Sequence, residues 1–500
     1  NAVSTTLPDI AGGDYGIYSG TVKYYDGVLR GGIEAYQDGA ITSIADNATI
    51  QFSTSSGYHI VYLAEEHFVV KNGETKYTKL SDAISESEVG DTIELIDDNY
   101  LFYTLSVPSE KELSILTNGF SIHTGNPIVN SGKITITNNT PTAQTIEYIR
   151  GDYFITNNAD AELTLNNINI NAAYGINNSG KTTLANVSVA SSNAAIKNTG
   201  NFLANNAILS GDSYPIYNDT GESNLTNTSF VGEYTYNNSG TLKITGGSAS
   251  KTNTASNIGD YFTNKGTMEL DSTQITLTNT NPTYNYSYDH NHYRALYNSG
   301  SLVLNNGTTI SHIIDAPNST ITKQSSTVHN DGGAVIIASS SIIYTATNTR
   351  NYSYDSRAIY SPTGTVAIES GTVSATGIGR AYGIYTDSGT IIIGTPEPPD
   401  SPNYGRDTAD VSTTSPDISA ISTSTSNSYK LGVGVKNASG GRVEYYDGKV
   451  SGNTSAFAEE PTATEHFYEV CTELDTTTTP NLYTAKLFWM RDGQSTCANN

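Results

Sequence analysis

One short stretch of this chain reads Asn130-Ser131-Gly132-Lys133-Ile134-Thr135-Ile136-Thr137, a tight polar turn followed by alternating apolar and polar residues. Close variants of the turn recur, as Asn178-Ser179-Gly180, Asn198-Thr199-Gly200, Asn238-Ser239-Gly240 and Asn298-Ser299-Gly300. The successive anchors Gly180, Gly200, Gly221 and Gly240 are 20, 21 and 19 residues apart. A fixed period near 20 residues indicates a solenoid, whose coils contact only their neighbours and present long surfaces.

The residue types of this coil suggest how each turn is made. Glycine permits a positive φ and asparagine tolerates the left-handed region, so we expect both at a sharp corner. Stacked corners would let the asparagine side chains form a ladder, in which each amide donates to the next coil. In the strands, Ile134 and Ile136, or Leu302 and Leu304, should point inward, and the residues between them outward.

Composition excludes several classes of function. The 500 residues include 45 glycines and only 15% charged residues, which fits a narrow continuous core better than a large globular one. The net charge of −24 argues against binding to nucleic acid, which requires basic surfaces. No apolar run approaches 18 residues, so we expect no direct membrane insertion. No nucleotide-binding or other cofactor motif is present, and we predict no cofactor.

A longer repeat is superimposed on the coil repeat. The segment Val22-Lys23-Tyr24-Tyr25-Asp26-Gly27 returns as Val443-Glu444-Tyr445-Tyr446-Asp447-Gly448, an offset of 421 residues. We therefore expect residues 1–70 to be the end and cap of a preceding module, and residues 75–450 to be a second module. Residues 451–500 would form a strand-rich C-terminal cap or linker, because an open solenoid end exposes unpaired strand edges. The chain would be an excised or mature piece of a longer secreted protein with tandem modules.

The second module has a predicted beginning. Tyr77, Leu80 and Ile84 have helical spacing within the segment Lys76-Tyr77-Thr78-Lys79-Leu80-Ser81-Asp82-Ala83-Ile84-Ser85. They predict a short amphipathic helix that covers the open end of the first coil. Thr92-Ile93-Glu94-Leu95-Ile96 should open the first strand. This order, with the Asn-Ser-Gly coils that follow, resembles the β-helix modules of large bacterial surface proteins, which share the pectate-lyase-like fold. The resemblance covers most of residues 75–450 and implies an all-β, right-handed parallel β-helix.

The coil period lengthens where insertions occur, and loops on a rigid scaffold are common binding sites. The insertion that contains Tyr286 and the one that contains Tyr352 have similar sequences. A third segment, Arg380-Ala381-Tyr382-Gly383-Ile384-Tyr385, matches them in part. Tyrosine with arginine and aspartate is typical of recognition surfaces, although these tyrosines could equally stack on one another and stiffen the loops. The candidate binding residues in these loops are Tyr286, Tyr288, Asp289, Arg294, Tyr297, Tyr352, Tyr354, Asp355, Arg357 and Tyr360.

Signals for chemistry are weak. The run Asp289-His290-Asn291-His292 offers no predictable third ligand, so no metal site is predicted. A β-helix lyase needs a basic residue close to acidic ones, and the local pairs of that kind are Arg294 with Asp289 and Arg357 with Asp355. No dense cluster of acids surrounds either pair, and we predict no catalytic residues. A polysaccharide lyase is kept as an alternative.

The sequence as a whole favours a secreted, non-catalytic protein. Cys471 and Cys497 are the two cysteines, both near the C-terminus, and are predicted to form one disulfide, which fits an exported protein. We expect an extracellular, cell-surface stalk or adhesin, made of β-helical modules, whose Tyr-rich loops contact a glycan or a host or neighbouring-cell protein. The other alternative is a fibre subunit whose loops mediate self-association.

Overall fold

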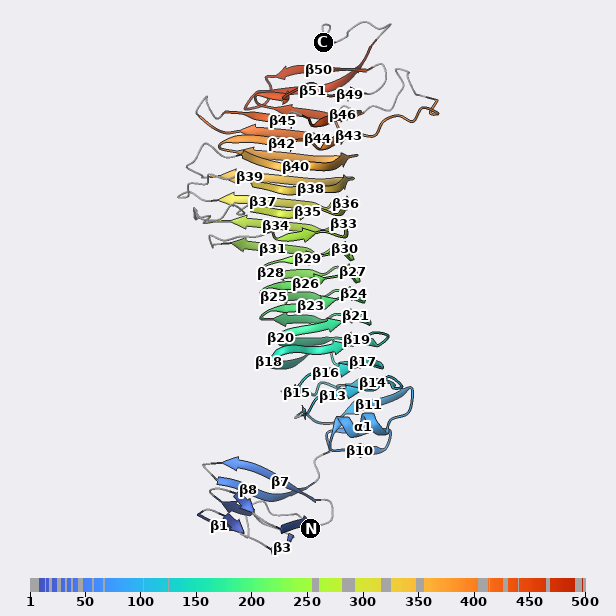
Figure 1. Ribbon diagram of the computed structural model, residues 1–500, viewed down its shortest axis with the longest axis vertical. Helices are drawn as coiled ribbons and strands as arrows, with labels where there is room; N and C mark the ends of the chain where they lie inside the picture. The colour runs from blue at the N-terminus through green and yellow to red at the C-terminus, as the bar shows by residue number, and fades with distance from the viewer. Residues whose placement is uncertain are drawn as a thin grey trace.

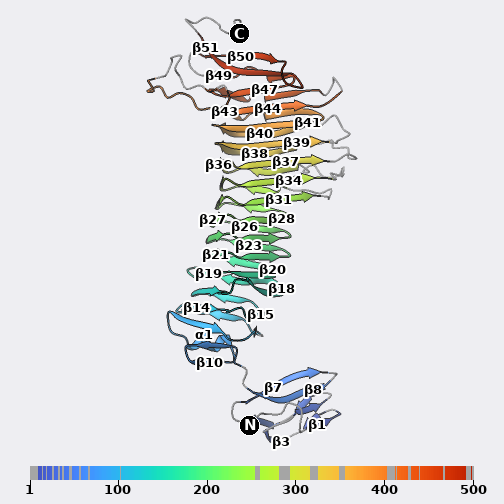
Figure 2. The same ribbon diagram turned by 180° about the vertical axis from the view of Figure 1, so that it is seen from behind.

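The computed structural model is nearly all β (Figure 1). It describes residues 9–13, 15–17, 20–24, 28–31, 34–36, 39–43, 48–55, 58–65, 68–101, 103–124, 126–253, 260–280, 293–315, 325–347, 355–402, 412, 414–425, 430–438, 440–464, 468–490 and 497. Within this part of the chain, no helix has the length and hydropathy of a membrane span. From about residue 90 onward the strands stack into a long column, seen from behind in Figure 2.

Most strands belong to three parallel ladders, in which each strand pairs with its equivalent one coil further along the chain. The first ladder contains β11 (Asp91–Leu95), β14 (Glu112–Leu116), β17 (Lys133–Thr137), β19 (Glu162–Asn166), β21 (Lys181–Ala185), β24 (Asn201–Asn205), β27 (Glu222–Thr226), β30 (Thr241–Thr245), β33 (Thr267–Asp271), β36 (Ser301–Asn305), the second halves of β38 (Ser325–Ile337) and β40 (Asp355–Ile368), β43 (Thr390–Ile393), β46 (Arg442–Tyr445) and β49 (Ala463–Thr464).

The second ladder contains β12 (Asn99–Leu101), β15 (Ile122–Thr124), the first halves of β18 (Gln144–Asn157) and β20 (Ile168–Asn178), β22 (Ser188–Ser191), β25 (Ile208–Gly211), β28 (Ser229–Gly232), β31 (Ser248–Asn253), β34 (Gln274–Asn279), β37 (Thr309–Asp315), β39 (Ser340–Thr347), β41 (Gly371–Gly377), β44 (Asp417–Ser422) and β47 (Lys449–Gly452).

The third ladder contains β13 (Leu105–Val107), β16 (Ile128–Asn130), the second halves of β18 and β20, β23 (Ala194–Asn198), β26 (Tyr214–Asn218), β29 (Thr235–Asn237), β32 (Phe262–Asn264), β35 (Tyr293–Asn298), the first halves of β38 and β40, β42 (Arg380–Thr386), β45 (Gly432–Asn437) and β48 (Ser455–Phe457). One continuous apolar core runs between the ladders, and Ile134, Ile136, Leu302 and Leu304 point into it as predicted.

The expected ladder of asparagine side chains is present. It lies where the strands of the third ladder end. Each side-chain amide nitrogen donates to the amide oxygen one coil further along, at 2.7–2.9 Å. Its members are Asn130, Asn157, Asn178, Asn198, Asn218, Asn237, Asn264, Asn298 and Asn330, all fully buried. The member in the coil of Gly240 is Asn237, whereas the neighbouring Asn238 bonds to Asp219 instead.

The expected positive φ occurs at the turn glycines Gly364 and Gly440 but is wrong for the Asn-Ser-Gly turns and their close variant Asn198-Thr199-Gly200. Gly132, Gly180, Gly200, Gly240 and Gly300 do not have left-handed backbones. They are glycines because the coils touch: a Cβ on Gly200 would lie 2.1 Å from the carbonyl oxygen of Gly180 in the preceding coil. Left-handed asparagines occur at a different corner, directly after the first-ladder strands, at Asn167, Asn186, Asn206, Asn227 and Asn306. The sequence predicts glycine and left-handed asparagine at one sharp corner, whereas these glycines and the left-handed asparagines belong to separate turns.

The predicted helix is present but shorter than expected. Helix α1 spans Leu80–Glu86 and buries Leu80, Ala83 and Ile84 against the first coil. Tyr77 lies before it in β10 (Thr75–Tyr77), which forms an antiparallel hairpin with β9 (Val70–Asn72). The first strand of the column, β11, follows as predicted.

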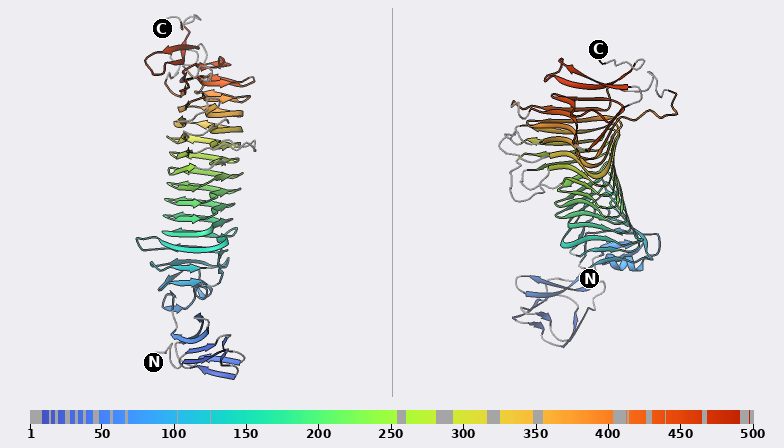
Figure 3. Two further views of the ribbon diagram at one scale, coloured as in Figure 1. Left: turned by 90° about the vertical axis from the view of Figure 1, so that its left-hand side faces the viewer. Right: turned by 45° about the horizontal axis from the view of Figure 1, so that its top comes forward.

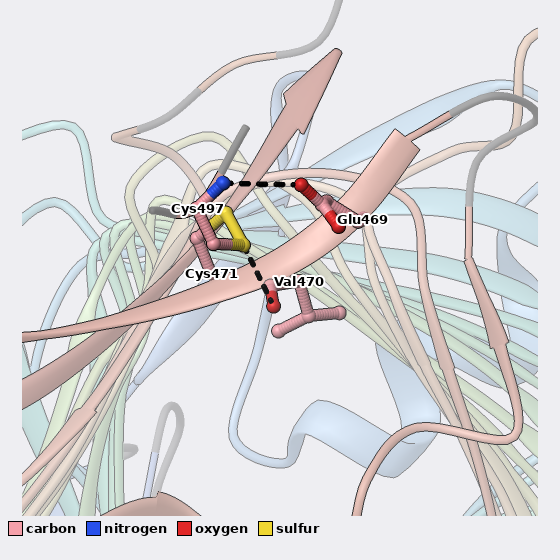
Figure 4. The surroundings of a disulfide bond; sticks show 4 residues. All are labelled: Glu469, Val470, Cys471 and Cys497. Atoms are coloured by element: carbon pink, nitrogen blue, oxygen red, sulfur yellow. Dashed lines mark hydrogen bonds between the residues drawn. A yellow bond between two sulfur atoms is a disulfide. The ribbon is translucent and has the colours of Figure 1, made fainter. Parts of the chain in front are cut away.

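An antiparallel hairpin covers the C-terminal end of the column (Figure 3). It consists of β50 (Tyr468–Asp475) and β51 (Leu482–Trp489), and β51 also pairs antiparallel with β47. The buried Tyr445 hydroxyl lies 3.0 Å from the Ala485 carbonyl, which connects the last coils to the hairpin. Cys471 is joined to Cys497 by a disulfide, and the Cys497 backbone N–H donates to Glu469 Oε1 at 3.1 Å (Figure 4).

The N-terminal residues repeat this terminal arrangement. Their strands are β1 (Asp9–Gly12), β2 (Tyr15–Ile17), β3 (Gly20–Tyr24), β4 (Val28–Gly31), β5 (Glu34–Tyr36), β6 (Gly39–Ser43), β7 (Ala48–Ser55) and β8 (Tyr58–Glu65). Parallel pairs β1–β4, β2–β5 and β3–β6 correspond to β44–β47, β45–β48 and β46–β49, and the antiparallel β4–β8–β7 corresponds to β47–β51–β50. The pairing register is also the same. Lys23 pairs with Thr42 in the N-terminal copy, and Glu444 pairs with Ala463 in the C-terminal copy. Glu444 follows Lys23 by 421 residues, and Ala463 follows Thr42 by 421 residues.

Candidate binding surface

Half of the candidate binding residues can be placed. Tyr286, Tyr288, Asp289, Tyr352 and Tyr354 lie outside the described residues. The other five lie in strands of the third ladder and not in the loops, with Arg294 and Tyr297 in β35 and Asp355, Arg357 and Tyr360 in β40.

The two look-alike sequences occupy equivalent positions two coils apart. Arg294 faces Ser326, which faces Arg357, and Tyr297 faces His329, which faces Tyr360. The third partial match is shifted, because Tyr385 faces Tyr360 whereas Arg380 faces Asp355 and not Arg357. The ladder thus brings together residues that the sequence separates by 25 or more positions.

Tyr297 and Tyr360 belong to a longer row, which we call the tyrosine stripe. Its members are register neighbours on the third ladder, and each directly precedes a buried polar residue, which is an asparagine except after Tyr360 and Tyr385: Lys197, Tyr217, Tyr236, Thr263, Tyr297, His329, Tyr360, Tyr385 and Lys436. Most of these side chains are half-buried. The members outside the insertions were not predicted from the sequence, although an aromatic residue directly before a ladder asparagine, as in Tyr217-Asn218, would have identified several of them.

Ring contacts run along the stripe from coil to coil. Tyr217 stacks on Tyr236 with centroids 5.1 Å apart and an interplanar angle of 1°. His329 lies between Tyr297 and Tyr360, with centroid distances of 5.6 and 5.0 Å. These stacked and edge-on contacts between successive coils restrict the described rings and stiffen the ladder.

Arg294 makes a cluster in which charge is balanced. Its guanidinium lies 4.6 Å from the Tyr297 ring centroid and forms a two-pronged ion pair with Asp260, in which Nη2 donates to Oδ2 at 3.1 Å. Both side chains are about 15% exposed. Burial raises the pKa of Asp260, and the arginine opposes that shift. This partner lies 34 positions before Arg294, not in the neighbouring insertion.

Arg357 makes a second cluster, which is buried more deeply. The guanidinium is 2% exposed, lies 4.1 and 4.2 Å from the ring centroids of Tyr360 and Tyr385, and bonds to Asp355 at 2.6 Å. The Arg380 Nε also lies 2.6 Å from Asp355 Oδ1. Because its faces are covered by aromatic rings, Arg357 holds neighbouring coils together and is not accessible to a large ligand.

Hydroxyl groups of the stripe bond to acidic residues. The Tyr360 hydroxyl donates to Asp387 at 2.5 Å, and the Tyr297 hydroxyl donates to Asp331 at 3.2 Å. Burial and then the bond to Asp387 raise the pKa of Tyr360 to about 12. These tyrosines therefore stay protonated at neutral pH and act as hydrogen-bond donors.

Cavities and metal-ligand groups add little to the site. A shallow hollow of about 280 Å³ lies beside the bulge of β18, lined by Glu147, Tyr148, Asn171, Ala172, Ala173 and Ser192. Among the described residues, one group of three possible metal-ligating side chains was found, Glu469 with Cys471 and Cys497, and its two sulfurs are already joined. No protein-family model, curated protein or solved structure matches this chain.

Proposed function

We propose that this protein is a non-catalytic, extracellular stalk on a cell surface, built from right-handed parallel β-helix modules of the kind found in large bacterial surface proteins. Residues 75–450 would be one module, started by α1 and followed by a cap in residues 451–500. Three long parallel ladders around a narrow core support a parallel β-helix. The disulfide between Cys471 and Cys497 fits an oxidising, extracellular compartment.

The observation that carries this proposal is the repeated end structure. Strands β1–β8 pair in the same order and register as β44–β51, which supports residues 1–70 as the end of another module. Ile10 on β1 is 45% exposed, whereas the equivalent Ile418 on β44 is fully buried. In the second module β41 covers that edge, pairing Val373 with Ile418. A preceding coil would cover Ile10 in the same way.

Contacts with a partner would come from one corner of the stalk. The long insertions fall between the second- and third-ladder strands of successive coils, after β34, β37 and β39, and the third-ladder strands that follow them carry the tyrosine stripe. A glycan or a protein of a host or neighbouring cell would bind there.

Electron microscopy of the full-length protein on its source cells tests the stalk. We expect beaded rods with a repeat of one 421-residue module. Isolated particles of a single module would contradict the array and return attention to polysaccharide cleavage, which a polyuronide panel assayed for unsaturated ends would detect.

Variants of the insertions test the contact role. Tyr288→Ala and Tyr354→Ala should weaken binding to cells that carry the partner and leave Tm unchanged, with Ser287→Ala and Ser353→Ala as matched controls. Binding unchanged in both tyrosine variants would remove the insertions from the proposal. Concentration-dependent filaments of the isolated chain in sedimentation would instead favour the self-assembling fibre.

A further inference from the structure

The C-terminal end of the tyrosine stripe carries more cationic than acidic groups. Around Asp355 lie Arg357 and Arg380, both 2.6 Å from its carboxylate oxygens, and Lys436 lies on the next strand. The Lys436 ammonium is 5.1 and 5.0 Å from the ring centroids of Tyr382 and Tyr385. Among the described residues, no carboxylate lies within ion-pair distance of Lys436.

The remaining acid of this region does not balance the charge. The second acid is Asp387, which accepts a hydrogen bond from the Tyr360 hydroxyl. Arg357, Arg380 and Lys436 thus carry three positive charges near the two negative charges of Asp355 and Asp387. This is a local excess of one positive charge in a chain of net charge −24. By contrast, Arg294 is matched by Asp260 in a two-pronged pair. The excess is therefore a property of this end of the stripe.

Polar atoms at the base of this cluster are also left without hydrogen bonds. Within the described part of the chain, the Tyr382 hydroxyl is fully buried and has no partner, and neither Asp355 Oδ1 nor Arg380 Nε makes a bond of good geometry despite their 2.6 Å separation. Burial raises the pKa of Tyr382 to about 12, so it is a hydrogen-bond donor at neutral pH. A buried donor without an acceptor is costly, so the polar groups beneath Arg380 and Lys436 are incompletely satisfied.

The cations are accessible where an acceptor would approach. The Arg380 side chain is 41% exposed, and Lys436 is half-buried. Burial lowers the pKa of Lys436, and the charges of Arg380 and Arg357 act in the same direction against Asp355. A bound anion would relieve this repulsion between like charges.

We propose that Arg380 and Lys436, whose ammonium lies over the Tyr382 ring, form a subsite for an oxyanion, the carboxylate or sulfate group of an acidic polysaccharide. Arg380 and Lys436 supply charge-assisted donors, and the aromatic faces beneath Lys436 exclude water from the ammonium. The subsite rests on the proposed contact role of this corner and gives its partner a chemical class.

Binding of the full chain to polymers of defined charge tests the subsite. The probes are a sulfated glycan such as heparin, a carboxylated one such as hyaluronan, and neutral dextran, each titrated at low and physiological salt. We expect an acidic polymer to bind, dextran not to bind, and affinity to fall as salt rises. Preference for heparin or for hyaluronan assigns the oxyanion as sulfate or carboxylate, and competition by inorganic sulfate would support the subsite directly.

Variants locate the binding. Lys436→Met combined with Arg380→Gln should weaken binding of the acidic polymer about tenfold or more, because a charged hydrogen bond is lost. Lys265→Met is the control, since Lys265 directly follows β32, lies 5.5 Å from the Tyr236 centroid and is close enough to Asp260 to act on its pKa, and it should change binding less than about twofold. Equal losses in both variants, or equal binding of dextran, would overturn the subsite. If microscopy shows arrays while no acidic polymer binds, the subsite alone fails.

Discussion

The side-chain amide nitrogen of Asn198 donates to the side-chain oxygen of Asn218 in the next coil at 2.9 Å, and both residues are fully buried. The same nitrogen lies within hydrogen-bonding distance of the Glu222 carbonyl, and the Asn198 oxygen accepts from Asn178. One residue type thus supplies a donor and an acceptor to two neighbours. A ladder of this kind satisfies buried polar groups at the corner where the third-ladder strands end, from Asn130 to Asn330.

Asn198→Asp should destabilise the column strongly. The carboxylate can accept from Asn178 but cannot donate to Asn218, and it places an uncompensated charge in the interior, at a cost of about 3 kcal/mol. Thermal and urea unfolding would measure the loss. Asn206→Asp is the control, because Asn206 is exposed at a left-handed corner where aspartate is tolerated, and it should change stability by less than about 0.5 kcal/mol. Similar losses for both variants would mean that the ladder contributes little.

Gly200→Ala tests the close approach of successive coils. Its Cβ would lie 2.1 Å from the Gly180 carbonyl oxygen, so the coils must separate, and we expect a loss of about 2 kcal/mol. Gly151→Ala has no atom within 4 Å of its Cβ and no left-handed backbone, and should be close to neutral. Comparable melting temperatures for the two variants would contradict this account of the turn glycines.

His312 should make stability depend on pH. The side chain is fully buried, its Nε2 faces the Asn279 amide nitrogen at 2.9 Å, and its Nδ1 lies 3.1 Å from the Ser326 carbonyl. Burial lowers its pKa from 6.5 to about 4, with the Ser326 bond opposing the shift. The unfolded chain therefore binds a proton at higher pH than the folded one.

Above pH 6.5 His312 is neutral in both the folded and the unfolded chain and adds no pH dependence to the free energy of unfolding. As pH falls from 6.5 towards 4, the unfolded chain binds the proton first, and the fold loses stability. By pH 4.5 the free energy of unfolding should have fallen by about 2–3 kcal/mol. Urea unfolding at pH 7 and 4.5 measures it, and His312→Gln should lower stability at both pH values but show a smaller difference between them. An identical pH dependence in the variant would show that other groups cause it.

Removing the disulfide should affect the terminal cap and leave the column intact. The bond closes a loop of 26 residues, so Cys471→Ser with Cys497→Ser should cost about 3 kcal/mol of local stability. Because coils interact with nearest neighbours, hydrogen exchange should quicken in β50 and β51 while amides of β23 and β26 keep their protection. Faster exchange throughout the column would show that the cap stabilises all coils together.

The pattern of the coil was predictable from the sequence because its causes are local. Alternating apolar residues, a short amphipathic segment at Leu80–Glu86 and asparagines spaced by one coil each leave a periodic signal. The period even predicted that asparagines would stack. The asparagine of the ladder could still be misidentified by one position, as at Asn237 and Asn238, because two adjacent asparagines look alike until one of them is buried.

The tertiary structure decided what the residues of the stripe contact. Arg294 pairs with Asp260, and Arg357 becomes buried between Tyr360 and Tyr385, because neighbours in a ladder come from different coils and the separation between coils varies with each insertion. The turn glycines follow the same logic, since the atom that excludes a Cβ at Gly200 lies in the coil of Gly180. The sequence alone determined a periodic stack of short strands, whereas contacts between coils determined which polar and charged groups are satisfied.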